Sequence, residues 1–363
     1  MPLFEVTARD RKIYEEEIRD FLPDKIIDIH AHIWLESLIP PKPLAKGETQ
    51  RTVTWPSLVA RDNSLEDLQE TYRLMFPGKQ VIPLLFTSTR RDTQGPLNAY
   101  VADCAKTNGY PALYYSMPEQ SGRELEQAIL KDGFLGIKSY LSLSPDYLPE
   151  KELRIFDFFP KEQLRAMDRL GAVVMLHIPR DGRLRDPVNI AQVLEIKREF
   201  PQIRLIIAHI GRAYVKENVG NALEIYAAEC PDLMFDFSAN CCEYAIHELL
   251  RLMGPKNALF GSDLPILRMR TRRIEENGIY INLVPPGLYG GAQQDKHLRE
   301  VSAAEGEQMT FFLYEEILAF KRAAAKLGLS RQDVQDVFYG NAERLLNGAK
   351  ESIEQHKKGS KRG

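Results

Sequence analysis

The chain has 363 residues, of which 44% are hydrophobic and 27% are charged, a globular profile with ample apolar material for a large core. Its 48 basic and 51 acidic residues give a formal net charge of -3, which offers no electrostatic reason to expect nucleic acid or an anionic membrane as a partner. The acidic first 22 residues lack the apolar core of a signal peptide, and no apolar run approaches the roughly 20 residues that span a bilayer.

Short apolar runs rich in β-branched residues recur along the chain and predict strands. They span residues 25–30, 81–86, 112–116, 134–140, 172–177, 203–209, 233–238 and 257–263. Most are continuously apolar, as expected for parallel strands buried on both faces. Segments with helical periodicity separate them, beginning for example at Leu65, Pro96 and Lys161, and Asp186 followed by Pro187 is typical of a helix start. Strand then helix, repeated eight times, predicts an α/β fold of the closed (β/α)8 TIM-barrel type.

The segments outside this alternation define the expected organisation. A doubly wound open sheet also alternates strand and helix, but no G-x-G-x-x-G turn follows the first run. We expect one barrel domain over 23–347, an added N-terminal helix over 1–22, and a frayed polar tail over 348–363. The connections 35–64 and 264–306 are long enough to be binding loops, and both follow a strand, so they would cover the same end of the barrel.

Polar residues gather where the predicted strands end. Four of the seven histidines lie there, and so do one lysine and one aspartate: His30, His32, His177, His209, Lys138 and Asp263. In a barrel these positions open onto one rim, where active sites of this fold are found. A lone histidine at a strand end is more often an ordinary hydrogen-bonded residue, but imidazole and carboxylate groups on one rim are ligands for a divalent metal. Asp28 alternates with His30 and His32, so we expect it on their face, orienting them.

Several motifs together resemble one family. They are D-x-H-x-H at 28–32, His177, AHIG at 208–211, GSDLP at 261–265 and VFYGNAERLL at 337–346. The set is similar to the amidohydrolase superfamily, in its amidohydrolase-related (amidohydrolase 2) branch of TIM-barrel enzymes, over about residues 25–347.

The resemblance implies a set of site residues. His30, His32, His177 and Asp263 match the family's metal ligands, and His209 matches a histidine that binds a second metal or contacts the substrate. In binuclear members a carboxylated lysine bridges two metals, and Lys138 occupies a plausible position for it. The alternatives are a single-metal site, which is commoner in this branch, and a lysine that pairs with a carboxylate or binds an anionic substrate. The implied cofactor is a divalent metal, zinc first, with manganese or iron as alternatives.

The same residues suggest a chemistry. Asp263 is the expected acid–base group, and His209 would polarise a substrate carbonyl. Arg212 and Arg180 are predicted to bind a substrate carboxylate, the alternative for each being a surface salt bridge; Arg268 and Arg270 would add positive charge to the last long loop. The predicted function is therefore metal-dependent hydrolysis of a C–N or C–O bond, in an amide, cyclic amide or lactone of a small carboxylate-bearing compound.

Two other functions remain open at this point. The family also contains non-oxidative decarboxylases, so a lyase reaction on the same scaffold is the alternative. A non-catalytic barrel is disfavoured because every ligand position holds a competent residue. The four cysteines show neither C-x-x-C spacing nor a disulfide framework, so we expect a cytoplasmic location. The expected partner is a small-molecule substrate, with no nucleic acid or membrane, and the analogy leaves a homo-oligomer open.

Overall fold

Parallel strands form the centre of the molecule. The computed structural model describes residues 3–39, 59–88, 94–289 and 295–360. The central strands, in chain order, are β1 (Lys25–His32), β2 (Gln80–Phe86), β3 (Tyr114–Tyr115), β4 (Gly136–Lys138), β5 (Val173–Leu176), β6 (Arg204–Ile207), β7 (Met234–Asp236) and β8 (Ala258–Leu259). Each lies within a predicted run, or within two residues of its ends, so the eight predicted strands are confirmed.

The strands close into a barrel. β1 pairs with β2, and β3 to β8 pair consecutively, all in parallel. Backbone hydrogen bonds bridge the remaining seams: Leu113 N–H donates to Leu85 O between β2 and β3, and Ile29 N–H donates to Phe260 O between β1 and β8. The fold is therefore a (β/α)8 TIM barrel, as predicted.

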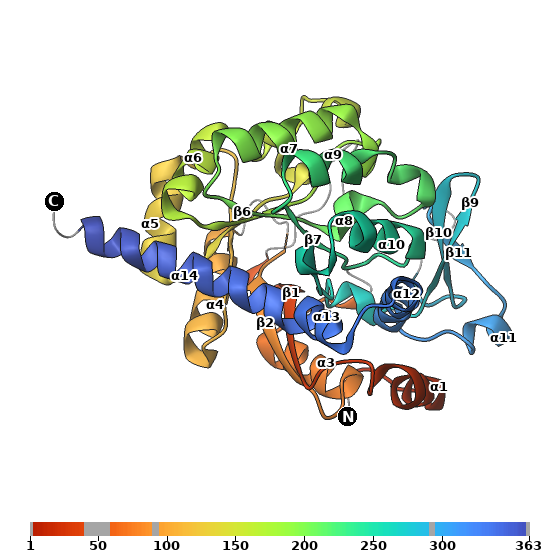
Figure 1. Ribbon diagram of the computed structural model, residues 1–363. Coiled ribbons are helices and arrows are strands. Elements are labelled where there is room, and N and C mark those ends of the chain that lie inside the picture. Colours follow the sequence, from red (N-terminus) through yellow and green to blue (C-terminus); the bar gives the residue numbers. More distant parts are fainter. Residues whose placement is uncertain (1–2, 40–58, 89–93, 290–294, 361–363) are drawn as a thin grey trace.

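Helices surround the barrel, as Figure 1 shows. The longer ones are α3 (Leu65–Met75), α4 (Gln94–Asn108), α5 (Gly122–Asp132), α6 (Lys161–Leu170), α7 (Pro187–Glu199), α9 (Ala222–Glu229), α10 (Glu243–Leu252) and α12 (Phe312–Leu327). Their starts follow from local chemistry: the Ser64 hydroxyl accepts from Asp67 N–H, and Asp186 accepts from the first turn of α7, with Pro187 as its first residue. In the part of the chain that is described, no helix combines the length and apolarity needed to cross a membrane.

Short helical turns lie in the connections. They include η2 (Glu36–Leu38), η4 (Leu141–Leu143), η5 (Glu150–Glu152), η6 (Ile155–Asp157), η7 (Arg183–Arg185), α8 (His209–Arg212), η8 (Lys216–Asn218), η9 (Pro255–Asn257) and η10 (Ile266–Arg268). Two of them, η7 in the connection after β5 and α8 immediately after β6, carry arginines to the carboxyl ends of the strands.

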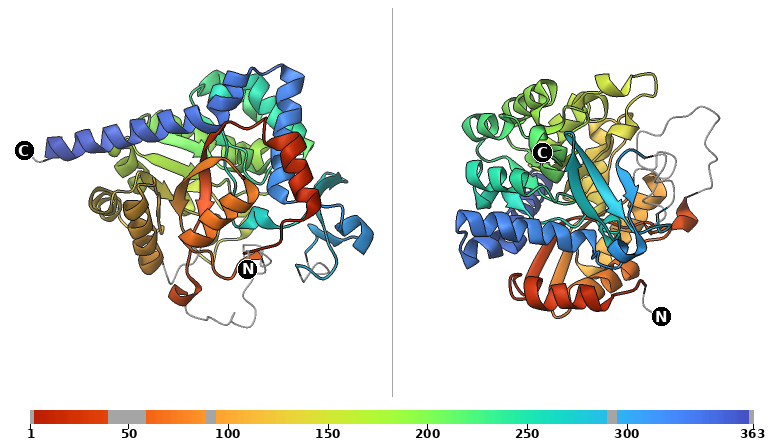
Figure 2. Two further views of the ribbon diagram at one scale, coloured as in Figure 1. Left: turned by 90° about the horizontal axis from the view of Figure 1, so that it is seen from below. Right: turned by 90° about the vertical axis from the view of Figure 1, so that its right-hand side faces the viewer.

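Both ends of the chain are helical. The N-terminal extension contains α1 (Ala8–Ile13) and the π-helical turn η1 (Tyr14–Ile18), and α13 (Arg331–Gln335) and η11 (Asp336–Gly340) lead into α14 (Asn341–Ser360). The expectation of a frayed tail from residue 348 is wrong, because α14 continues to Ser360. Ala349 and Ile353 are buried in this stretch, which explains why the helix persists. Figure 2 shows its last turns projecting past the barrel.

The segment after β8 is only partly a loop. Within 264–306 the chain forms a three-stranded sheet, β9 (Arg272–Glu276), β10 (Ile279–Val284) and β11 (Leu298–Glu300), followed by α11 (Ala303–Gly306). The prediction of an irregular loop there is corrected: Asn277 and Gly278, both with positive φ, form the turn of an antiparallel hairpin. The figures place this sheet at one edge of the molecule, beside α12. Of the predicted loop 35–64, residues 40–58 lie outside the described part.

Candidate active site

A bulge in β1 directs two histidines into the barrel. Ile27 and Ile29 belong to the apolar cluster inside the barrel, and Asp28 faces outward, where it accepts a hydrogen bond from the Tyr72 hydroxyl at 2.7 Å. The pairing with β2 then shifts register between Asp28 and Ala31. Because a bulge inverts the alternation of side chains, His30 and His32 also point inward. The prediction that Asp28 shares their face is therefore wrong.

Asp28 supports the backbone and not the imidazoles. Its carboxylate accepts from His30 N–H at 3.1 Å and from Ser262 N–H at 2.8 Å, as well as from the hydroxyls of Ser262 and Tyr72. These contacts fasten β1 to the segment after β8. Burial raises the pKa of Asp28 to about 6, although its hydrogen bonds act in the opposite direction.

Each of three histidines has its Nδ1 in contact with an acceptor. His30 Nδ1 lies 3.0 Å from Asp236 Oδ2, His32 Nδ1 lies 2.8 Å from Thr87 O, and His209 Nδ1 lies 2.9 Å from Ser238 O. An acceptor at this position keeps the proton on Nδ1 in the neutral ring. Each Nε2 therefore presents a lone pair, which is the state that a metal ligand needs.

Asp263 completes a convergent donor set. Its Oδ1 lies 3.3 Å from His32 Nε2 and 3.5 Å from His30 Nε2. Burial raises the pKa of Asp263, but the hydrogen bond with His32 and the nearby imidazoles outweigh burial and hold the pKa below its usual value. These three potential ligand atoms lie within 4.8 Å of one another. Two imidazole nitrogens and an ionised carboxylate fit a divalent metal.

Lys138 lies beside this set. Its Nζ is 2.7 Å from His30 Nε2 and 3.8 Å from the centre of the Phe86 ring. The residue is 2% exposed, and burial lowers its pKa to about 7, against the opposing charges of Asp263 and Asp236. A large fraction of the amine is thus neutral near pH 7, which is the form that carboxylation requires. Carboxylation itself stays a prediction.

His177 and His209 extend the row of imidazoles. The ring centres of His209 and His30 are 4.7 Å apart, and those of His177 and His209 are 4.9 Å apart. His177 is buried, its ring lies 4.3 Å from that of Tyr140, and its Nδ1 has no partner among the residues of the described ranges. It lies outside the tight donor set of His30, His32 and Asp263. All six residues predicted at the strand ends nevertheless meet at one end of the barrel.

The two arginines predicted to bind substrate, Arg180 and Arg212, differ in their contacts. Arg180 pairs with Asp186 at 3.1 Å, and that carboxylate also caps α7, so the alternative interpretation, a structural ion pair, applies to it. Arg212 donates through Nη1 to Ile178 O and Pro179 O and has no carboxylate partner in the described ranges.

The two arginines assigned to the last loop are structural. Arg270 pairs with the buried Asp10 of the N-terminal extension, and Arg268 is buried, with its guanidinium 5.6 Å from the Phe4 ring and in contact with Thr71. Neither adds free charge to the rim, which corrects the expectation for both residues.

Three residues at or beside the site are not predicted from the sequence. Asp236 ends β7 within the apolar run 233–238. A polar residue at the end of a predicted strand is the sequence signal that identifies it. Tyr115 aligns with Lys138 in the β3–β4 register, is fully buried, and its hydroxyl has no partner within the described ranges. Arg183 lies in η7, and no sequence pattern distinguishes it from its neighbours Arg180 and Arg185.

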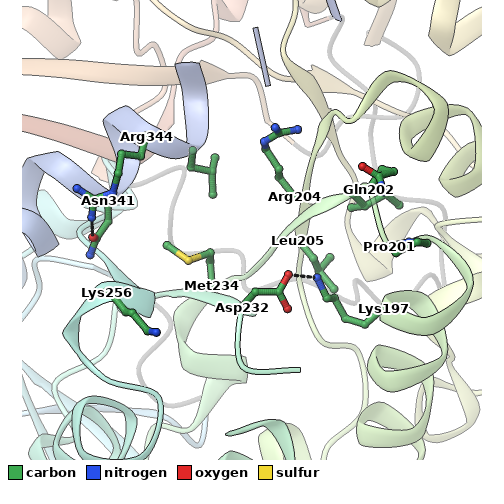
Figure 3. Close-up of a pocket in the computed structure, with 12 residues that line it drawn as sticks. Lys197, Pro201, Gln202, Arg204, Leu205, Asp232, Met234, Lys256, Asn341 and Arg344 are labelled. Atoms are coloured by element: carbon green, nitrogen blue, oxygen red, sulfur yellow. Dashed lines mark hydrogen bonds and ion pairs between the residues drawn. The ribbon is translucent and has the colours of Figure 1, made fainter. Parts of the chain in front are cut away.

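A separate cavity of about 420 Å³ lies at the opposite end of the barrel (Figure 3). It is lined by residues that precede β6 and β7 and by the first turns of α14. Two of its lining residues, Lys197 and Asp232, form a salt bridge of 2.6 Å. Because the amino ends of the strands form this face, the cavity lies away from the histidines and plays no part in the candidate site.

Comparison with known proteins agrees with this geometry. The amidohydrolase family model matches residues 27–348, and no curated protein matches significantly. A dihydroxybenzoic acid decarboxylase from a Polaromonas species, solved with bound manganese, is 15% identical, with 90% of this chain and 97% of that chain covered and a TM-score of 0.53. A 2,6-dihydroxybenzoate decarboxylase from Rhizobium is 14% identical, with 90% and 99% covered and a TM-score of 0.53. A putative 2-pyrone-4,6-dicarboxylic acid hydrolase from Pseudomonas putida is 16% identical, with 90% and 99% covered and a TM-score of 0.51.

Proposed function

Because the chain belongs to the amidohydrolase family, whose members use a divalent metal, we propose that it is a metal-dependent hydrolase of a small carboxylate-bearing compound. The bond attacked is a C–N or C–O bond, in an amide, cyclic amide or lactone. The observation that carries this proposal is the convergence of His30 Nε2, His32 Nε2 and Asp263 Oδ1, each in its metal-binding form, at the carboxyl end of the barrel.

His30, His32, His177 and Asp263 would hold the metal, with zinc, manganese and iron all compatible with nitrogen and oxygen ligands. His209 and Lys138 are the residues available to a second ion. A divalent metal supplies Lewis acidity at the reacting carbonyl and lowers the pKa of water. The remaining chemistry belongs to the chain's own side chains.

Asp263 and His209 divide the proton transfers. Asp263 is ionised, so it takes the proton of the attacking water and returns it to the leaving nitrogen or oxygen. The His209 Nδ1 proton is held by Ser238 O, so Nε2 of the neutral ring accepts a proton and does not donate one. His209 therefore polarises a carbonyl only as an imidazolium, and Arg212, three residues later, holds the substrate carboxylate.

A second candidate is non-oxidative decarboxylation of an aromatic carboxylate. It is favoured by the fold neighbours named as dihydroxybenzoate decarboxylases and by Arg212, which has no carboxylate partner among the residues that the structure describes. In that reaction the carboxylate leaves as carbon dioxide and the ring carbon takes up a proton. Asp263 or His209 delivers that proton only after first being protonated, by solvent or by a hydroxyl of the substrate.

The two reactions differ in their proton balance. Hydrolysis of a lactone at pH 8 releases one proton, whereas decarboxylation consumes one proton and releases carbon dioxide. We would load the protein with zinc or manganese, offer lactones, cyclic amides and hydroxybenzoates, and record base uptake and carbon dioxide together. A ring-opened or cleaved product without carbon dioxide or bicarbonate supports the hydrolase; a lactone then also releases a proton, whereas the amine product of an amide takes that proton up. Release of carbon dioxide or bicarbonate overturns the hydrolase in favour of the lyase.

Variants connect either activity to the site. Asp263→Asn should lower kcat at least about 100-fold, as expected for loss of a general acid–base group. His30→Ala should also lose metal, measured as equivalents per chain. His247→Ala is the matched control, since His247 lies on α10 and contacts Glu248 away from the rim. Full metal content and turnover in His30→Ala would contradict the proposed ligand set.

A further inference from the structure

Two arginines that have no carboxylate partner in the described part of the chain lie next to each other at the rim. Arg183 Nη1 donates to Arg212 O at 3.1 Å. Burial lowers the pKa of Arg183, and the charge of Arg212 lowers it further, so the two guanidinium groups are within electrostatic range. No carboxylate within the described ranges forms a salt bridge with either one. Two neighbouring, partly buried cations without an anion are unfavourable in the free protein.

Aromatic rings hold Arg183 in place. Its Cζ lies 5.0 Å from the ring centres of both Tyr214 and Tyr280, whose rings are 5.1 Å apart. Arg273 contacts the same rings, with its Cζ 4.5 Å from Tyr214 and 4.6 Å from Tyr280. Arg273 donates to Asn282 Oδ1 and Ala239 O, so it fixes the rings to the β9–β10 hairpin. Contact with the two rings orients the Arg183 guanidinium without using up its N–H donors, apart from the one that hydrogen-bonds the Tyr280 hydroxyl.

The backbone adds a second sign of a built site. Arg183 and Arg212 both adopt left-handed φ angles, 58° and 59°. This conformation is uncommon for residues other than glycine and clusters at functional sites. Of the five N–H donors of Arg183, one is used by Arg212 O and one hydrogen-bonds the Tyr280 hydroxyl, which leaves three, enough for a bidentate contact with a carboxylate.

The cluster adjoins the candidate active site. The Tyr214 ring is 6.5 Å from that of His209, and Arg212 acts electrostatically on both His177 and Tyr140. A substrate whose first carboxylate is held by Arg212 therefore extends toward Arg183 on the side away from the metal ligands.

We propose that Arg183, braced by Tyr214 and Tyr280, is a second anion-binding subsite, and that the substrate is a small dicarboxylate. This inference rests on the proposed function for the position of the first carboxylate on Arg212. The specificity-determining residues then come from η7, from the segment after β6 and from the hairpin after β8, which explains why the last connection is folded as a sheet.

Binding of unreactive probes tests the proposal without turnover. The probes are the three benzenedicarboxylates, which vary the spacing of the two charges, and the monomethyl ester of each, which keeps the shape and removes one charge. Isothermal titration would be carried out on the metal-loaded protein. At least one diacid should bind about tenfold or more tightly than its monoester, because one hydrogen-bonded charge pair contributes about that factor.

The variants separate Arg183 from general charge effects. Arg183→Gln should reduce the diacid preference to about one and change monoester affinity less than about twofold. Arg185→Gln is the matched control from the same turn, because Arg185 is exposed, and it should keep the full preference. Arg183→Lys retains the positive charge but loses the planar guanidinium edge, so it should show a reduced diacid preference. If Arg183→Gln does not fold, this variant provides the test instead.

Either of two results overturns the subsite: no diacid preferred by the parent protein, or a full preference retained in Arg183→Gln. Because none of the probes has to react, the titration stands if the hydrolysis and carbon dioxide assays both fail. Conversely, if the protein turned over monocarboxylates and bound no diacid preferentially, the proposed function would stand and the proposal of a dicarboxylate substrate would be refuted.

Discussion

Replacing Asp236 by asparagine should weaken metal binding through the tautomer of His30. Asp236 is fully buried, and four donors converge on it. Oδ1 accepts from His209 N–H at 2.8 Å, Ser238 N–H at 3.1 Å and the Ser238 hydroxyl at 2.6 Å, and Oδ2 faces His30 Nδ1 at 3.0 Å. An asparagine satisfies most donors by keeping its oxygen at Oδ1. Its amide N–H2 group then faces His30 Nδ1, which carries a proton in the parent protein and therefore needs an acceptor there.

The imidazole must respond by moving its proton from Nδ1 to Nε2, the atom that the metal requires. Loss of such an orienting partner typically costs a factor of about 10 to 100 in metal affinity, or about 1.4 to 2.7 kcal/mol. We therefore expect Asp236→Asn to raise the metal Kd by about 10 to 100-fold. A competition titration against a chromophoric chelator would measure it, with the Tm recorded for each variant.

Asp28→Asn provides a matched control. Asp28 is also fully buried and also accepts four hydrogen bonds, but none comes from an imidazole. Two of its donors are the hydroxyls of Ser262 and Tyr72, which can rotate and accept from an amide. This variant should change the metal Kd less than about threefold. Equal weakening in both variants would refute the tautomer argument and assign the effect to general disruption of the buried network.

Three further predictions concern stability. Burial and nearby carboxylates raise the pKa of Glu316 well above its usual value, so the folded state keeps a proton that the unfolded chain loses above about pH 4.3; stability should fall by up to about 1.4 kcal/mol per pH unit above that point, and Glu316→Gln should remove this slope in urea unfolding between pH 5 and 8. Arg270→Ala should cost about 3 kcal/mol, because it leaves the buried Asp10 unpaired, whereas Arg299→Ala, from an exposed pair, should cost less than about 1 kcal/mol; equal losses would contradict this. Tyr115→Phe removes a buried hydroxyl that has no hydrogen-bond partner within the described ranges, so Tm should stay the same or rise; a clear decrease in Tm would show that the hydroxyl has a stabilising partner.

The barrel could be predicted because its signal is local and repeated. Each apolar run is long enough to show its burial, and helices separate the runs, so errors in single boundaries do not change the order of elements. The polar strand ends could be predicted for the same reason: parallel strands place their carboxyl ends together whatever the details of the loops. His30, His177, His209 and Asp263 needed no further information.

The remainder depended on geometry that a sequence pattern does not contain. The bulge in β1 inserts one residue, and the resulting inversion separates Asp28 from His30, although strict alternation would have placed them together. Most residues of the tail are polar, yet the burial of Ala349 and Ile353 is enough to hold one face of α14 against the rest of the protein. In the same way, the position of η7 determines that Arg180 pairs with Asp186 and that Arg183 has no carboxylate partner among the described residues.

The distribution of paired and unpaired charges separates the two ends of the barrel. At the amino end of the strands, Lys197 pairs with Asp232, and α14 closes the interior with apolar side chains. At the carboxyl end, Arg183 and Arg212 lie near each other without an anion in the described ranges, which is unfavourable for the free protein. Natural proteins keep such arrangements where function needs them, since stability alone would favour a carboxylate partner. We therefore infer from this uncompensated charge where the substrate's negative groups bind, independently of the histidines from which we infer the metal site.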